Sequence, residues 1–300
     1  MDLDLEDRFA GSLLGLALGD ALGAPHEGGP AGQAVWWLLG LGKGDLLRWT
    51  DDTEMAMGLA ESLIENRGLD ADRLARAWAD RVDWKRGYGS GTRNLLGLIR
   101  EGADWRAANR AIIPEGSFGN GASMRAAPLG LFFHRDPGEL TLAAELASSI
   151  THAHPLGIEG GLLIARATAM ALRGGVDTVL LREGARTAEF RDLLSLAREE
   201  LDRKEVRRRL GAGVEAHRSA VTAVHLANRF REFMPMIEFT ISLGGDTDTI
   251  GAMAGGIFGA RHGTKALPLD ALDRLEERDW IERTARRLCG VAVERSDSKP

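Results

Sequence analysis

Two short segments combine threonine with aspartate in a pattern that could bind a divalent cation. The first is Trp49–Thr53 (W-T-D-D-T) and the second is Gly244–Thr249 (G-G-D-T-D-T). Each lies at the expected start of a helix, where a single Asp or Thr can cap the free backbone N–H groups. Capping is therefore the ordinary explanation. A second carboxylate adds repulsion with little further capping, however, and neither segment has an interleaved Lys or Arg.

A bound cation would remove that repulsion. Hard cations such as Mg²⁺ prefer oxygen ligands, and two-ion sites need carboxylates that can bridge. The two segments supply only oxygen ligands, with no softer group that would favour zinc. The candidate metal ligands are Thr50, Asp51, Asp52, Asp246, Asp248 and Thr249. A shared site requires that the first and last thirds of the chain pack together.

The glycines suggest how this packing occurs. Glycine makes up 38 of the 300 residues, well above the usual share of about 7%. Two sets recur at every fourth position: Gly11, Gly15, Gly19 and Gly23, and then Gly251, Gly255, Gly259 and Gly263. This spacing puts each set on one helix face. Such a face would let another backbone approach closely, which would offset a helix penalty of about 1 kcal/mol per glycine. Chance recurrence in a glycine-rich chain is the alternative.

Three further segments carry polar groups, and each has an ordinary explanation. Gly116–Arg125 has small residues that could expose backbone N–H groups to a phosphate, or could form a simple turn before a helix. Thr151–Pro155 (T-H-A-H-P) is either a capped loop or a contact to a diphosphate or a ribose. Glu27 precedes a flexible glycine-rich stretch and is either a surface residue or a mobile carboxylate over a site.

Apolar residues at three- and four-residue spacing predict helices through most of the chain, and strand-like alternation is nearly absent. The expected helices are 7–23, 52–66, 71–82, 92–101, 139–150, 156–173, 186–201, 213–229, 231–242, 249–262 and 270–288. Segments 24–50 and 103–128 are expected to be long ordered loops. With no linker composition between halves, we expect a single all-α domain over 1–291 and a polar tail over 292–300 that is frayed from Glu294 onward.

Composition excludes several classes of partner. A net charge of −6 argues against a general nucleic-acid binder, which is usually basic. A single cysteine, Cys289, excludes an intrachain disulfide framework and fits a reducing compartment. The apolar stretch 11–24 contains Asp20 and is too short to cross a bilayer. We therefore expect a cytoplasmic protein with no nucleic-acid or membrane partner.

Taken together, five segments resemble the ADP-ribosylglycohydrolase family, which includes the dinitrogenase reductase-activating glycohydrolases. In the family's order they are G-S-L-L-G-L-A-L-G-D-A-L-G-A-P-H-E (11–27), W-T-D-D-T (49–53), G-N-G-A-S-M-R (119–125), T-H-A-H-P (151–155) and S-L-G-G-D-T-D-T (242–249). The resemblance implies a compact orthogonal multi-helix bundle with a binuclear Mg²⁺ or Mn²⁺ centre in a cleft.

The resemblance also implies an activity, namely metal-dependent hydrolysis of an N- or O-glycosidic bond at C1″ of ADP-ribose. The substrate would be an ADP-ribosylated protein or a small ADP-ribose conjugate. A non-catalytic ADP-ribose binder, or a structural relative like the family's lens crystallins, is the alternative. The resemblance assigns the two ions to the six candidate ligands given above.

By the same resemblance, catalytic roles fall to Glu27, near the scissile bond, and to Asp51 and Asp248. The residues facing the diphosphate and the distal ribose would be Gly119, Asn120, Gly121, Ser123, Met124 and His152.

One departure concerns the leaving group. The nitrogenase-reactivating branch is similar through Gly89–Arg93 (G-S-G-T-R) but places a functional Asp just upstream. This chain has Gly87 and Tyr88 there, so the resemblance does not extend that branch's arginine-linked substrate to this sequence.

Overall fold

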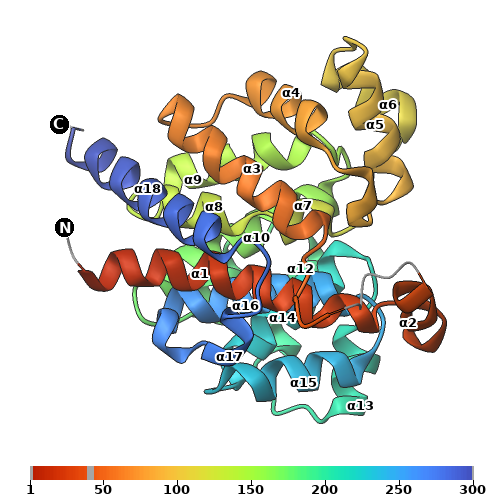
Figure 1. The fold of residues 1–300 in the computed structure, drawn as a ribbon, viewed down its shortest axis with the longest axis vertical. Helices are drawn as coiled ribbons and strands as arrows, with labels where there is room; N and C mark the ends of the chain where they lie inside the picture. The colour runs from red at the N-terminus through yellow and green to blue at the C-terminus, as the bar shows by residue number, and fades with distance from the viewer. Residues whose placement is uncertain (1–2, 39–43, 299–300) are drawn as a thin grey trace.

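The computed structural model describes residues 3–38 and 44–298, and within these ranges the chain forms helices joined by turns, without a strand. Figure 1 shows α1 and α16 crossing the middle of the molecule, with the other helices arranged around them. Nearly all buried apolar side chains belong to one contiguous core. The predicted all-α, single-domain fold is confirmed.

The helices up to residue 132 are α1 (Leu3–Gly23), η1 (Ala24–His26), α2 (Gly29–Leu38), α3 (Asp51–Asn66), α4 (Ala71–Arg81), η2 (Trp84–Arg86), α5 (Ser90–Arg100), α6 (Trp105–Ile112), α7 (Gly121–Met124) and α8 (Ala127–Phe132). Those that follow are α9 (Pro137–Ser149), α10 (Pro155–Ala171), α11 (Thr178–Glu183), α12 (Ala188–Leu196), α13 (Arg203–Glu205), η3 (Val206–Leu210), α14 (Ala216–Arg229), α15 (Phe233–Leu243), α16 (Thr247–His262), η4 (Thr264–Ala266), α17 (Leu269–Leu272) and α18 (Arg278–Asp297).

Helices α1 and α16 run antiparallel and touch through their glycine faces. A Cβ atom placed on Gly15 would lie 2.4 Å from the carbonyl oxygen of Gly255, and one on Gly19 would lie 2.0 Å from that of Gly251. Both distances are far below van der Waals contact, so only glycine allows the two backbones to come this close. The close approach predicted from the fourfold glycine spacing is confirmed.

This contact brings the C-terminal end of α1 to the N-terminal end of α16. The Thr247 hydroxyl donates a hydrogen bond to the carbonyl oxygen of Gly23 at 2.9 Å. Further along, the Ser12 hydroxyl donates to the carbonyl oxygen of Gly256 at 2.8 Å. The two hydrogen bonds fix the register of the pair, and α16 therefore presents its first turn beside the last turn of α1.

The predicted long loops are wrong in part. Segment 24–50 contains η1 and α2, while residues 39–43 lie outside the described residues. Segment 103–128 contains α6, α7 and the first two residues of α8. Helix α6 begins where the Asp104 side chain accepts hydrogen bonds from the N–H groups of Arg106 and Ala107. Such a cap is a signal for a helix start that apolar periodicity does not contain.

The position at which the C-terminal tail was expected to begin is also wrong. Helix α18 continues through Asp297, and ion pairs join Arg295 to Glu139 and Arg67 to Glu294. The helix expected over 270–288 is instead two helices, α17 and α18. They are separated at Glu277, whose backbone has a φ of 55°.

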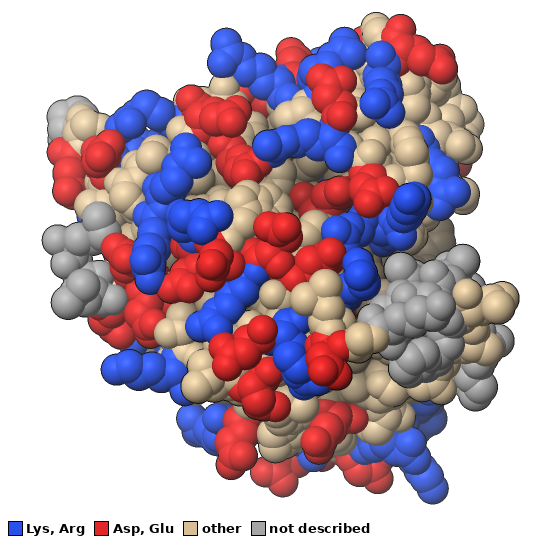
Figure 2. All heavy atoms as spheres, viewed as in Figure 1, with Lys and Arg blue, Asp and Glu red and all other residues tan. Residues whose placement is uncertain are grey.

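Charges of both signs are interspersed over the face drawn in Figure 2, which shows no continuous basic area. Among the described residues, no helix combines the length and the apolar character that a membrane crossing requires.

The glycine contact can be tested through stability. Gly15→Ala should lower the free energy of unfolding by about 2–4 kcal/mol, because the added methyl group meets a backbone carbonyl that cannot move aside. Urea denaturation measures the change. Gly290→Ala is the matched control, since nothing lies within 4 Å of its added methyl group, and it should gain up to about 1 kcal/mol. Wild-type stability in Gly15→Ala would contradict the account.

Candidate active site

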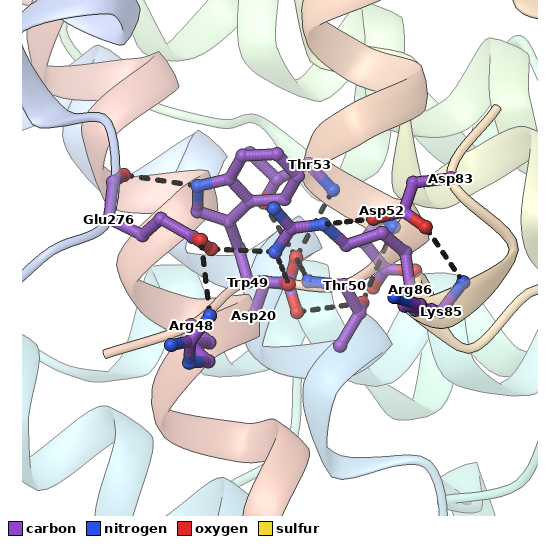
Figure 3. A network of polar contacts seen from close by, with 10 residues as sticks. All are labelled: Asp20, Arg48, Trp49, Thr50, Asp52, Thr53, Asp83, Lys85, Arg86 and Glu276. Atoms are coloured by element: carbon purple, nitrogen blue, oxygen red, sulfur yellow. Dashed lines mark hydrogen bonds and ion pairs between the residues drawn. The ribbon is translucent and has the colours of Figure 1, made fainter. Parts of the chain in front are cut away.

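A buried carboxylate on α1 organises the first acidic segment. Asp20 accepts four hydrogen bonds, from the backbone N–H groups of Thr50 and Thr53 at 2.9 and 3.1 Å and from their hydroxyls at 2.8 and 2.6 Å. Figure 3 shows these bonds converging on Asp20 from the start of α3. Asp20 therefore fixes the backbone that presents Asp51 and Asp52.

The residue before this turn is held from its other side. The Trp49 indole N–H donates to the carbonyl oxygen of Glu276 at 3.0 Å. The Arg86 guanidinium lies 3.7 Å from the centroid of the Trp49 ring and donates to the Glu276 carboxylate at 2.6 Å. These contacts, also visible in Figure 3, anchor the chain that enters α3.

The two acidic segments meet at one point. Thr249, in the first turn of α16, donates from its hydroxyl to Asp52 Oδ1 at 3.3 Å. The other oxygen, Asp52 Oδ2, is buried and has no hydrogen-bond partner among the described residues. A buried oxygen without a partner is costly, and in a group of like charges it fits a divalent cation as the missing partner.

Glu27 joins the second segment. Carboxylate oxygens of Glu27, Asp246 and Asp248 all lie within 4.8 Å of one another. Asp246 and Asp248 are buried, whereas Glu27 is exposed. A hydrogen bond from the Gly28 N–H to the carbonyl oxygen of Gly245, at 3.3 Å, holds the Glu27 turn against the start of α16.

Burial and mutual repulsion raise the pKa values of Glu27, Asp51, Asp52 and Asp248. The pKa of Asp51 rises to about 8, mainly through burial and then through the charges of Asp20, Glu27 and Asp246. For Asp52 and Asp248, burial is again the largest cause and neighbouring carboxylates add to it, so both pKa values lie well above the usual range.

Glu27 responds in the same way, because burial, Asp246 and Asp20 all raise its pKa. Without a cation, part of the cluster is expected to hold protons. The donor set of carboxylate and hydroxyl oxygens therefore fits Mg²⁺ or Mn²⁺.

The glycine-rich segment lies beside this cluster, but its side chains differ in what they face. The Asn120 amide donates to Asp246 Oδ2 at 2.6 Å and to the Ser219 hydroxyl at 3.1 Å, so this side chain holds a carboxylate. Ser123 and Met124 are buried in α7. Ser123 packs against α10, where a Cβ atom on Gly160 would lie 2.4 Å from its hydroxyl.

His152 is brought next to the glycines of the same segment. A Cβ atom on Gly121 would lie 3.0 Å from the imidazole ring, and one on Gly119 would lie 3.7 Å from its Nε2. The structure therefore packs the buried His152 ring against Gly119 and Gly121, while Ser123 and Met124 are also buried.

Asp20 is the residue that sequence reasoning missed as part of the site. The sequence carries one signal for it, an acidic residue within an otherwise apolar helix that also bears the fourfold glycine repeat. A charged residue in that position needs buried partners, and the threonines of the W-T-D-D-T segment are those partners.

The fold and the site together define a class, namely all-helical proteins that gather carboxylates from both ends of the chain beside a glycine-rich loop. A family profile described as ADP-ribosylglycohydrolase matches residues 1–298. "ADP-ribosylhydrolase ARH3" of Xenopus tropicalis is 31% identical over 94% of this chain and 96% of its own length. The human protein of that name is 29% identical over 94% of this chain and 93% of its own length.

A solved structure described as "ADP-ribosylglycohydrolase-related protein complex" superposes with a TM-score of 0.75. It has 29% sequence identity and covers 96% of this chain and 99% of its own. The chain belongs to the ADP-ribosylglycohydrolase family, a family of hydrolases.

The raised pKa values predict how stability depends on pH when divalent cations are removed. Because the folded-state pKa values of Asp51, Asp52 and Asp248 exceed their unfolded values, the folded state binds more protons above about pH 4, and for Asp51 this window extends to about pH 8. Stability in EDTA should therefore fall as pH rises through that window. Each such carboxyl contributes about 1.4 kcal/mol per pH unit.

Thermal unfolding across this pH range, with EDTA or with Mg²⁺, measures the effect. Mg²⁺ should stabilise most at the high-pH end, where the carboxylates are ionised. Asp52→Asn should flatten the slope in EDTA. A metal-free stability that rises steadily toward pH 8 would contradict this assignment.

Asp20→Asn tests the network at the start of α3. The amide replaces one acceptor oxygen by an NH₂ group that faces N–H and hydroxyl donors, so the free energy of unfolding should fall by about 2–4 kcal/mol. Asp80→Asn, on the exposed face of α4, is the control and should change stability by less than about 0.5 kcal/mol. Equal stability of the two variants in urea would rule out the proposed role of Asp20.

Proposed function

We propose that this chain is a divalent-cation-dependent hydrolase that cleaves the glycosidic bond at C1″ of ADP-ribose. The partner would be an ADP-ribosylated protein or a small ADP-ribose conjugate. One observation carries the proposal: in a member of this family, Asp52 keeps a buried carboxylate oxygen that has no hydrogen-bond partner within the described ranges 3–38 and 44–298, beside the carboxylates of the other acidic segment.

The residues that would hold two Mg²⁺ or Mn²⁺ ions are Thr50, Asp51, Asp52, Asp246, Asp248 and Thr249. When bound, such ions lower the pKa of water and stabilise charge in an oxocarbenium-like transition state. The geometry supports a shared site, since the Thr249 hydroxyl already bonds Asp52 across the two segments.

Glu27 is the side chain best placed to take a proton. Glu27 is the exposed member of the trio with Asp246 and Asp248 when the whole residue is considered. Its carboxylate is nevertheless partly removed from water, and this desolvation together with neighbouring charge raises its pKa. A carboxylate whose pKa moves toward the working pH is a better general base. Asp51 and Asp248 would contribute ionised oxygens next to the reacting bond.

On the ligand side, Gly119, Gly121 and His152 would face the diphosphate and the distal ribose, a role supported by the packing of the His152 ring against the two glycines. Asn120 would act through Asp246, to which its amide is bonded. Ser123 and Met124 would support the loop from beneath.

The leaving-group side supports an alternative to arginine-linked substrates. Gly87 lies beside the site, where a Cβ atom would stand 3.6 Å from Asp51 Oδ1. Tyr88 is turned away, since it is buried and its hydroxyl donates to Glu54 at 2.5 Å. No acidic group occupies either position.

A cytoplasmic location stays a prediction from the single cysteine.

Turnover on a panel of defined ADP-ribosyl conjugates tests the proposal. With Mg²⁺ or Mn²⁺ the enzyme should release free ADP-ribose, and EDTA should abolish release. Asp248→Ala and Glu27→Gln should each reduce the rate by at least about a hundredfold. Glu65→Gln, an exposed residue on α3, is the control and should keep the wild-type rate.

Two results would contradict the proposal. Release of AMP would indicate cleavage of the pyrophosphate instead. Tight ADP-ribose binding without turnover on any conjugate would support the non-catalytic alternative.

A further inference from the structure

Arg125, which follows α7, is a buried cation with unusual partners. Its side chain is almost fully buried, and its guanidinium carbon lies 4.2 Å from the Trp78 ring centroid. Nη1 donates to the sulfur of Met55 at 3.4 Å, and Nη2 donates to the Thr151 hydroxyl at 2.6 Å. Among the described residues, it makes no ion pair with a carboxylate. Thr151 therefore receives its strongest hydrogen bond.

Thr151 passes this interaction to the next residue. Its Oγ1 lies 2.6 Å from Nδ1 of His152. Since a guanidinium can only donate, Thr151 must use a lone pair on Arg125. Within the part of the chain that the structure describes, the two bonds to Arg125 and His152 are the only ones made by this hydroxyl.

The direction of the second bond follows from the hydroxyl proton. If His152 Nδ1 donated to Thr151, that buried proton would be left without an acceptor, which is costly. If Thr151 donates to Nδ1, the hydroxyl proton and the Nδ1 lone pair satisfy each other, and the hydroxyl still accepts from Arg125. His152 then has an acceptor at Nδ1 and its single N–H at Nε2.

Nε2 is the ring nitrogen nearest the glycine-rich loop. It lies 3.3 Å from the position of a Cβ atom on Gly121 and 3.7 Å from that on Gly119. Burial and the nearby Arg125 charge lower the pKa of His152 to about 3, so the ring stays neutral at physiological pH. A neutral imidazole has only one N–H, and its tautomer decides which nitrogen can donate.

We propose that Arg125 and Thr151 are positioning residues that hold His152 as the Nε2–H tautomer, so that it donates a hydrogen bond to a phosphate or ribose oxygen at the Gly119–Gly121 loop. The identity of the ligand rests on the proposed function, whereas the tautomer does not. In the other tautomer Nε2 would present a lone pair to a phosphate oxygen, and that contact would be repulsive, whereas toward a ribose hydroxyl Nε2 could only accept.

Nitrogen-15 NMR of the full-length, Mg²⁺-loaded protein measures the tautomer directly. The pyridine-type and pyrrole-type nitrogens of a histidine have well-separated shifts, and the His152 signals are assigned by their loss in His152→Gln. The wild type and Thr151→Ser should both show a proton on Nε2. Thr151→Val removes the donor to Nδ1, and a fraction of its rings should carry the proton on Nδ1. A wild-type Nδ1–H signal, or a Thr151→Val spectrum identical to the wild type, would overturn the proposal.

Calorimetric titration with ADP-ribose then measures the consequence for binding. Thr151→Val should weaken binding by about tenfold, the equivalent of one hydrogen bond, while Thr151→Ser should keep the wild-type affinity. His152→Gln places an amide N–H near the position of Nε2 and should retain more affinity than His152→Asn. Equal affinity of Thr151→Val and Thr151→Ser would overturn the proposal.

Thr168→Val is the structural control, because Thr168 is fully buried on α10 and its hydroxyl bonds only the Ile164 carbonyl oxygen among the described residues. It should leave both the His152 tautomer and the affinity unchanged. If the wild type failed to bind ADP-ribose, the proposed function would fail, and the NMR spectra would still decide whether Thr151 sets the His152 tautomer.

Discussion

The close backbone contact between α1 and α16 is the constraint on which the rest of the structure depends. Because the facing glycines bring carbonyl oxygens to where Cβ atoms would otherwise stand, the helices meet in one register. That register sets the end of α1, with Asp20, beside the start of α16, with Asp246 and Asp248. The close packing of these two helices therefore determines where the carboxylates lie.

The acidic groups gathered by this contact are satisfied in two different ways. Asp20 is buried but accepts four hydrogen bonds from Thr50 and Thr53, so it can serve as a fixed structural acceptor. Asp52 and Asp248 have few such bonds and face one another's charge. Asp20 orders the start of α3, whereas Asp52 and Asp248 have oxygen atoms for which a cation is a suitable partner. Neighbouring carboxylates therefore have different roles: Asp20 orders the backbone, whereas Asp52 and Asp248 keep oxygens that can bind a cation.

Much of this arrangement could be predicted from the sequence, because its signals are local and periodic. The fourfold glycine spacing predicted the close approach of α1 and α16, and the paired carboxylates marked the starts of α3 and α16. Contacts that join distant residues through single hydrogen bonds left no such pattern. The hydrogen bond from the Asn120 amide to Asp246 is one example, and the hydrogen bonds that the start of α3 donates to Asp20 are another. Short capped helices such as α6 were missed because a cap is one residue and not a period.

The central claim is that one packing contact builds a single cation site from both ends of the chain. Anomalous diffraction from crystals of the wild-type protein grown with Mn²⁺ tests it most directly. The account predicts manganese peaks bound by oxygens of both segments, with Asp52 and Asp248 contributing to the same centre. Peaks held by one segment alone, or by surface carboxylates away from α3 and α16, would contradict it.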